Sequence, residues 1–247
     1  MLIFLFPKSN IFGVHRELRI SSMSVRILFV TATGAEAAVL DKIPGIRPTA
    51  DGYLYGNADI RVLVTGVGTV STSWNLTKFI SAGYRPELAI NAGIAGSYRN
   101  NIAIGSVVVP LSDRFADVGI ETTEGFLSLA EAGLEDPDLF PFKGGEIIAS
   151  NEFIDKALTI VNPVRAITVN TASGTSDTIG RLKKKYAPDI ETMEGATFFY
   201  ICSGEKIPFL AFRSISNMVE PRDRSKWDIP LALDRLAEKL KDFFLTI

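Results

Sequence analysis

Short apolar runs alternate with helical segments along almost the whole chain, and this alternation constrains the fold more than any other feature. The runs are rich in branched residues and are continuously apolar, as in strands that are buried on both faces. We predict strands at 25–31, 61–65, 88–91, 104–110, 167–170, 190–193 and 209–214. We predict helices at 35–40, 69–81, after Thr175 as far as Tyr186, at 195–203, and from Pro230 to about Phe244.

This order of elements predicts an α/β fold in a single domain, with a mainly parallel mixed sheet sandwiched by helices in three αβα layers. A chain of 247 residues is long enough for one such domain. Ligands of these sheets bind beyond the carboxyl ends of the strands, and small residues recur at those ends here. We expect the polar stretch 121–145 to cover a site rather than to separate domains.

Composition excludes several function classes. The 26 basic and 28 acidic residues give a net charge of −2 with no long basic run, so we expect no nucleic-acid partner. A lone histidine, His15, leaves histidine triads and histidine-based metal sites without their parts. The single cysteine, Cys202, follows an apolar run and is expected to be a core thiol in the cytoplasm.

The first residues differ in character from the rest. The apolar stretch 2–6 is too short for a secretory signal or a membrane span, so we expect no membrane association. A second methionine, Met23, stands just before the first predicted strand. We therefore expect the domain to span 23–247 and residues 1–22 to be an extension outside the native protein.

Polar residues follow three of the predicted strands, and each has two readings. Glu194 stands between an apolar strand and an apolar helix, where its carboxylate either grips vicinal hydroxyls or accepts from backbone amides of the helix. Glu36 is either an exposed first-turn residue or a site residue, and Asn217 either an Asx turn or a site residue. Their convergence on one sheet edge favours a site. Gly66-Val67-Gly68 lacks the third glycine of a dinucleotide fingerprint and is equally well explained as a tight turn.

The order of these segments resembles the purine nucleoside phosphorylase and nucleosidase superfamily, from about Val25 to the C-terminal helix. The resemblance rests on six tracts: Ala32-Thr33-Gly34-Ala35-Glu36, Thr65-Gly66-Val67-Gly68, Ile90-Asn91-Ala92-Gly93-Ile94-Ala95-Gly96, Ile104-Gly105-Ser106-Val107-Val108, Met193-Glu194-Gly195-Ala196 and Arg213-Ser214-Ile215-Ser216-Asn217. Within the superfamily the chain most resembles the futalosine hydrolases, a similarity that the tract 217–223 supports.

The resemblance implies roles for individual residues. Glu36 matches the acid that activates the attacking water, Asn217 the residue that reads the base, and Met193 with Glu194 the ribose-binding pair. Trp227 matches an aromatic residue on the 5′ side, where Arg222 or Arg224 is expected to hold a substrate carboxylate. The remaining residues expected to line the site are Ala32, Ile94, Ala95, Gly96, Gly174, Thr175 and Ser216.

Departures from the superfamily pattern narrow the expected reaction. Asn91 and Ile94 stand where phosphorylases carry phosphate ligands, so water is the expected nucleophile. Asn217 replaces the aspartate of adenine-specific enzymes, which favours hypoxanthine. Gly174 and Thr175 replace the aromatic and branched pair of an adenine pocket.

The resemblance thus implies hydrolysis of futalosine to hypoxanthine and dehypoxanthine futalosine, in menaquinone biosynthesis, by a homo-oligomer, with a dimer favoured. It implies no metal or redox cofactor. Three alternatives stay open. They are a methylthioadenosine or S-adenosylhomocysteine nucleosidase, a purine nucleoside phosphorylase with unusual phosphate ligands, and a non-catalytic nucleoside-binding module.

Overall fold

The computed structural model describes residues 24–247, so the expected extension at 1–22, with His15, lies outside the described residues. The strands in that range are β1 Val25–Thr31, β2 Arg47–Pro48, β3 Gly52–Tyr55, β4 Ala58–Val64, β5 Leu88–Ser97, β6 Val107–Asp113, β7 Gly119–Thr122, β8 Gly125–Ser128, β9 Phe142–Lys143, β10 Glu146–Ile148, β11 Asn162–Thr168, β12 Ile190–Thr192 and β13 Phe209–Met218. The α-helices are α1 Gly34–Ala37, α2 Thr69–Ser81, α3 Glu152–Leu158, α4 Ser176–Tyr186, α5 Gly195–Gly204 and α6 Ile229–Phe244, and the 3₁₀ helices are η1 Leu40–Lys42 and η2 Arg224–Lys226.

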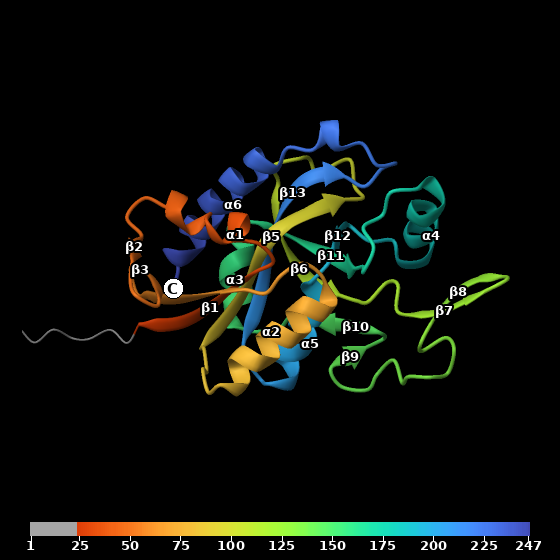
Figure 1. Ribbon diagram of the computed structural model, residues 1–247, viewed down its shortest axis with the longest axis horizontal. Helices are drawn as coiled ribbons and strands as arrows, with labels where there is room; N and C mark the ends of the chain where they lie inside the picture. Colours follow the sequence, from red (N-terminus) through yellow and green to blue (C-terminus); the bar gives the residue numbers. More distant parts are fainter. Residues whose placement is uncertain (1–23) are drawn as a thin grey trace, which may run out of the picture.

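Eleven strands form one mixed sheet in the order β2-β3-β4-β1-β5-β12-β11-β6-β10-β9, with β13 paired to both β5 and β6. Parallel pairs join β4, β1, β5 and β13, and further parallel pairs join β12, β11 and β6. Antiparallel pairs lie at the edges, where β12 meets β5 and where β13 meets β6. The strands β5 and β13 run side by side through the middle of the molecule (Figure 1).

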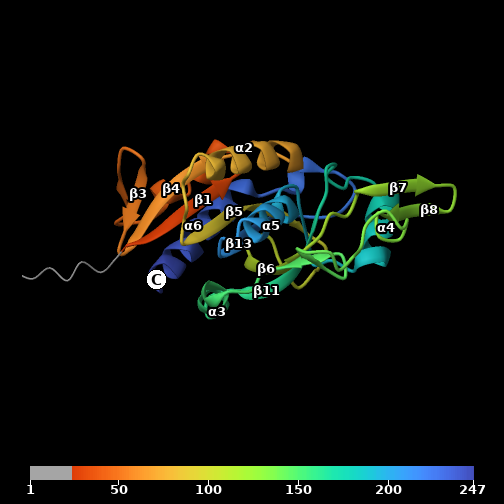
Figure 2. The same cartoon turned by 90° about the horizontal axis from the view of Figure 1, so that it is seen from below.

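Helices cover both faces of this sheet, which confirms the predicted α/β sandwich. On one face α2 packs beside α5, and on the other α6 packs against β5, β13 and η1 (Figures 1 and 2). The helix α6 buries an apolar stripe that includes Leu236, Leu240 and Phe243. Cys202 on α5 is fully buried, as predicted for a core thiol.

The strand β5 is longer than the sequence predicts. Its first half matches the predicted strand at 88–91, but the small residues expected to lie beyond the end of that strand continue it to Ser97. Gly93 pairs with Arg213 and Gly96 with Asn217. Glycine occurs here because side chains of neighbouring elements lie over the strand: a Cβ at Gly93 would lie 2.5 Å from the Glu36 carboxylate.

The bounds of other helices and strands agree with the predictions or differ from them by a few residues. The elements β1 and α2 coincide with their predictions, whereas α1 ends at Ala37 and a separate 3₁₀ turn follows it. The strand β6 begins at Val107 because Gly105, with φ +84°, forms a turn before it. The strand β11 begins at Asn162, five residues before the predicted start, because its first residues already pair with β6. The stretch 121–145 contains most of the β7–β8 hairpin, which projects at one end of the molecule (Figure 2).

Among residues 24–247, no helix has both the length and the apolar character that a membrane crossing requires.

Candidate active site

A cavity of about 390 Å³ lies beside β5, at the ends of β1, β12 and β13. Because β1 and β13 run parallel to β5, the cavity lies at the carboxyl ends of these strands, where α/β proteins bind ligands. The strand β12 runs antiparallel to β5. Eleven of the thirteen residues predicted for the site line it: Ala32, Glu36, Ile94, Ala95, Gly96, Met193, Glu194, Ser216, Asn217, Arg222 and Trp227. The structure therefore brings together residues that are up to 195 positions apart, from Ala32 to Trp227, around one space.

The other two predicted residues, Gly174 and Thr175, do not line the cavity. Thr175 caps α4, where its hydroxyl accepts from the Thr178 amide, and the Gly174 carbonyl accepts from the Arg222 amide at 3.2 Å. Because the start of α4 requires Thr175 as its cap, the loop turns away from the cavity at that point. Ala172 and Ser173 line the cavity in their place.

The carboxylate of Glu36 is buried, with 8% of the residue exposed, so it is not the exposed first-turn residue of the alternative reading. Its Oε2 accepts from the amide and the hydroxyl of Thr33, at 3.0 and 2.9 Å. Its Oε1 accepts from the Ile94 amide at 3.1 Å. These bonds, part of a capping box that begins α1, fix the carboxylate at the cavity wall.

Glu194 lies at the start of α5 but does not accept from the amides of its own helix. Its Oε1 accepts from the Gly68 amide at 2.8 Å, so the Gly66-Val67-Gly68 turn supplies a donor to this carboxylate. Burial raises the pKa of Glu194, and the Gly68 hydrogen bond and the charge of Arg213 oppose that rise. The site thus contains a carboxylate with unused acceptor positions beside Glu36.

Arg213 lies behind both carboxylates and is 2% exposed. Its guanidinium donates to the Asn91 carbonyl at 3.0 Å and to the Asn91 side-chain oxygen. Burial lowers the pKa of Arg213, and the charges of Glu194 and Glu36 counter that effect. Asn91 is therefore a structural partner of Arg213 beneath the cavity and does not line it.

Asn217 faces the cavity through an irregularity in β13. The register of β13 against β5 shifts just before Asn217, so both Ser216 and Asn217 line the cavity. The Ser216 hydroxyl donates to Asn217 Oδ1 at 2.8 Å, and Asn217 Nδ2 donates to the Met218 carbonyl at 3.0 Å. An amide in this arrangement keeps one N–H and one oxygen lone pair for a ligand.

Arg222 and Trp227 lie at another wall of the cavity, in the segment between β13 and α6. The Arg222 guanidinium stacks 5.2 Å from the centroid of the Trp227 ring. Arg224 does not line the cavity, and Lys226 forms an ion pair with Glu220 at 2.8 Å. Among the described lining residues, Arg222 is thus the one with a cationic side chain.

Glu191 is a lining residue that the sequence reasoning missed. It is 8% exposed, and its carboxylate accepts from the Tyr98 hydroxyl at 2.7 Å and from the Ser173 amide at 2.8 Å. The available signal was a second acid three positions before Glu194, within the short strand that precedes it.

A larger cavity of about 990 Å³ lies elsewhere, between α2 and the segment 128–145. It contains none of the predicted site residues, so the stretch 121–145 borders this space and not the predicted site. No group of three or more histidine, cysteine or acidic side chains in residues 24–247 is arranged to hold a metal ion.

Comparison with known proteins identifies relatives of this chain. Residues 26–247 match the family model described as the phosphorylase superfamily. The futalosine hydrolase of Acidothermus cellulolyticus is 32% identical over 228 residues, which cover 87% of this chain and 88% of that protein. A 5′-methylthioadenosine/S-adenosylhomocysteine nucleosidase of Glaesserella parasuis is 25% identical over 74% of this chain and 79% of its own length.

Solved structures share the fold. The structure of futalosine hydrolase from Helicobacter pylori superposes with a TM-score of 0.74 at 18% identity, covering 92% of this chain and all of that one. The family match includes every predicted site residue and all of the sheet except Val25, because it runs from the second residue of β1 to the end of the chain. The chain is a member of the phosphorylase superfamily.

Proposed function

We propose that this protein hydrolyses the N-glycosidic bond of futalosine, releasing hypoxanthine and dehypoxanthine futalosine, as a step of menaquinone biosynthesis. At the level of reaction class the protein is an N-glycosyl hydrolase, in agreement with its family and its relatives. The observation that carries the futalosine proposal is the Asn217 amide, which keeps a donor and an acceptor for a base in a cavity that also holds Glu36 and Glu194.

Glu36 activates the nucleophile in this proposal. Cleavage breaks the bond between C1′ and the purine nitrogen, and positive charge develops on the ribosyl ring. Water adds to C1′ and gives a proton to the Glu36 carboxylate, which the Thr33 and Ile94 donors hold in position. The nearby carboxylates also stabilise the positive charge of the transition state.

Glu194 binds the ribose. With the Gly68 amide on Oε1, the carboxylate keeps lone pairs on both oxygens, and two vicinal hydroxyls can donate to it. Met193 lies next to it on the cavity wall, where its apolar side chain packs against the sugar.

Asn217 stabilises the departing base. Its free N–H donates to O6 of hypoxanthine, and its free lone pair accepts from N7–H after N7 has taken a proton from solvent water. The electron pair of the broken bond is thereby neutralised on the departing purine. An adenine base would present its amino group to the same N–H, so Asn217 fits the 6-oxopurine better.

Arg222 and Trp227 form the candidate site for the carboxyphenyl group of futalosine. Trp227 offers a ring face for stacking, and Arg222 offers the cation that a carboxylate needs. Arg224, the other candidate, lies outside the cavity lining.

Two features favour water over phosphate as the nucleophile. Asn91 is occupied by Arg213, and Ile94 offers only an apolar side chain to the cavity. A phosphate dianion requires charged or multiple donors. The phosphorylase alternative therefore has less support than hydrolysis.

The second candidate function is that of a methylthioadenosine or S-adenosylhomocysteine nucleosidase, which the 25% identical relative supports. It shares the reaction and differs in the base and the 5′ group. The amide of Asn217 favours futalosine over this candidate.

We also propose that the protein is a cytoplasmic homodimer. The apolar side chains Val70 and Trp74 of α2 are 80% and 68% exposed, an arrangement that supports burial of this surface against a second copy. The buried free thiol of Cys202 supports a reducing compartment.

The test is hypoxanthine release from futalosine in phosphate-free buffer, with methylthioadenosine as the competing substrate and Glu36→Gln as the matched variant. We expect wild-type release without phosphate, a preference for futalosine, and at least a ~100-fold lower turnover for the variant with nearly unchanged binding. Phosphate dependence would indicate a phosphorylase, preference for methylthioadenosine would indicate the second candidate, and full turnover by the variant would remove Glu36 from the mechanism.

A further inference from the structure

Glu191 is a buried acid in the cavity to which the mechanism above gives no role. All donors to its carboxylate among the described residues are neutral: the Tyr98 hydroxyl, the Ser173 amide and the Ser173 hydroxyl. A buried carboxylate without a cation is costly, so a carboxylate that also faces a binding cavity points to a ligand that donates to it.

The hydrogen bonds to Glu191 leave a defined position for that ligand. Oε2 accepts from both hydroxyls, of Tyr98 and Ser173, while Oε1 accepts only from the Ser173 amide. Each carboxylate oxygen accepts about two hydrogen bonds. Oε1 can therefore take one further donor, and no described residue supplies it.

Glu191 and Asn217 flank the same glycine. In the sheet Glu191 on β12 pairs with Gly96 on β5, and Asn217 on β13 pairs with Gly96 from the other side. Paired residues on neighbouring strands project to the same face of a sheet. A Cβ at Gly96 would lie 2.8 Å from Val219 Cγ2 and 3.2 Å from Asn217 Nδ2, so the Val219 side chain packs over this glycine next to the Asn217 amide. Asn217 thus borders Gly96 from one neighbouring strand and Glu191 from the other.

This pair matches one edge of a 6-oxopurine. Along that edge N7 is followed by the C6 substituent and then by N1. If Asn217 reads N7 and O6, the next group along is N1–H, a donor that suits Glu191 Oε1. Adenine has a lone pair at N1 instead, which would face the carboxylate and leave both acceptors without a proton between them.

Resting on the proposed function, we propose that Glu191 is a specificity-determining residue that accepts a hydrogen bond from N1–H of the 6-oxopurine base and rejects adenine. A site built to pair with one polar group discriminates strongly against an analogue that lacks it, because its own buried groups lose their partner.

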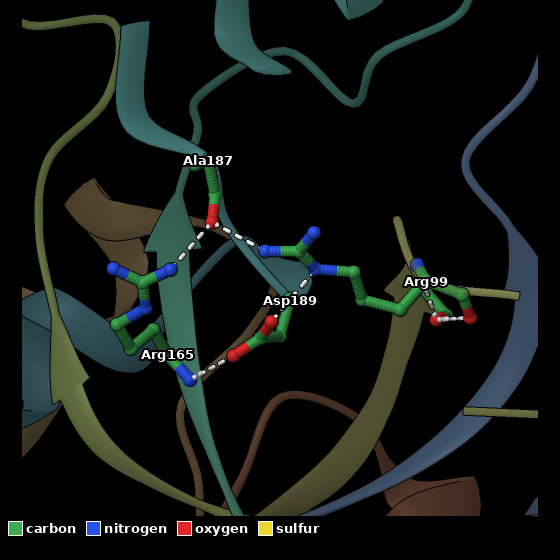
Figure 3. A network of polar contacts seen from close by, with 5 residues as sticks. Arg99, Arg165, Ala187 and Asp189 are labelled. Atoms are coloured by element: carbon green, nitrogen blue, oxygen red, sulfur yellow. Dashed lines mark hydrogen bonds and ion pairs between the residues drawn. The ribbon is translucent and has the colours of Figure 1, made fainter. Parts of the chain in front are cut away.

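The surroundings of Glu191 hold it in place. The Tyr98 amide donates to the Asp189 carbonyl at 2.8 Å, which ties β12 to the end of β5. Figure 3 shows that Asp189 accepts from the Arg99 side chain and the Arg165 amide, each at 2.8 Å. Both arginine side chains also donate to the Ala187 carbonyl, at 3.0 Å each. This network fixes the strand on which Glu191 lies, as a precise reader of a base requires.

The experiment measures binding of the free bases hypoxanthine, 1-methylhypoxanthine and adenine by isothermal titration calorimetry, in the wild type and in Glu191→Gln. We expect the wild type to bind hypoxanthine at least ~10-fold more tightly than either other base, since a methyl group or a lone pair replaces the N1 proton. The glutamine side chain keeps the shape and can donate to N1 of adenine, so the hypoxanthine-to-adenine ratio should fall at least ~10-fold.

Tyr98→Phe serves as the matched control, because it removes one donor to Glu191 and leaves the carboxylate; it should change the ratio less than Glu191→Gln. An unchanged hypoxanthine-to-adenine ratio in folded Glu191→Gln would overturn the proposal. So would a wild-type protein that binds the three bases equally or binds none of them. If Glu191→Gln does not fold, the 1-methylhypoxanthine comparison in the wild type decides alone. Futalosine turnover by the wild type is measured separately, so failure of the proposed function is distinguishable from failure of this assignment.

Discussion

Replacing Gly93 by alanine should disable the enzyme through Glu36, which the new methyl group would push aside. The added Cβ would lie 2.5 Å from Glu36 Oε1 and 3.2 Å from its carboxyl carbon. Gly93 belongs to β5 and pairs with Arg213 on β13, so its backbone has little freedom to move. Glu36 lies on the four-residue helix α1 and is the part that gives way.

The size of the effect follows from the displacement. Ordinary contact begins at 3.4 Å, so Oε1 must retreat by about 0.9 Å from its 2.5 Å separation. That retreat weakens the hydrogen bond from the Ile94 amide, at a cost of about 1 kcal/mol in stability. A misplacement of about 1 Å in a reacting group costs roughly 100-fold in rate, so we expect kcat to fall about 100-fold with little change in KM.

The assay is steady-state release of hypoxanthine from futalosine by Gly93→Ala, with Gly34→Ala as control. Gly34 lies two residues before Glu36, and an added Cβ there meets nothing within 4 Å, so the control should keep wild-type kcat. In a Glu36→Gln background Gly93→Ala should cause almost no further loss, because both changes remove the same function. A wild-type kcat in folded Gly93→Ala would refute this reasoning. So would a kcat of the double variant that falls by the full product of the losses in Gly93→Ala and Glu36→Gln.

Two further predictions concern the 5′ site and the core. Arg222→Ala should raise KM for futalosine about 10-fold and leave KM for inosine, which lacks the acid, nearly unchanged. Arg224→Ala should change neither KM value. Equal effects of Arg222→Ala on both substrates would place the binding site of the futalosine carboxylate elsewhere. Burial raises the pKa of Asp113 from 3.8 to about 7, and the hydrogen bond from Thr168 opposes that rise. The protein therefore loses stability as the pH rises from the unfolded-state value of 3.8 to the folded-state value of about 7. Urea unfolding at pH 5 and pH 8 should show that the wild type loses about 2–3 kcal/mol more than Asp113→Asn over this interval, and equal losses would contradict the shift.

Much of the fold follows from local pattern. The strand β1 and the helix α2 match their predicted bounds because continuous apolar runs and helical periodicity are properties of the residues within each segment. The approach of Glu36 and Asn217 to one cavity follows from the same pattern, since β1 and β13 run parallel to β5 and their carboxyl ends meet at one edge of the sheet. Glu194 joins them from β12, which runs antiparallel to β5.

Other features depend on neighbours that are distant in the sequence. The sequence predicts a strand that ends before the glycines of β5, because small residues are typical of the segments that follow strands. In the structure they continue the strand, and their small size accommodates the Glu36 carboxylate and the Asn217 amide. Which residue lies over a glycine depends on strand register, and no local pattern contains that information.

The sequence by itself therefore determined which segments become strands and helices and at which edge of the sheet polar groups gather. Only the tertiary structure decided that Glu191 faces the cavity beside Asn217, that Asn91 supports Arg213 beneath it, and that Gly174 and Thr175 turn away. The physical reason is that burial and periodicity are encoded along the chain, whereas the direction of a side chain at a site is set by the register of strands and the caps of helices that pack together only in the folded state.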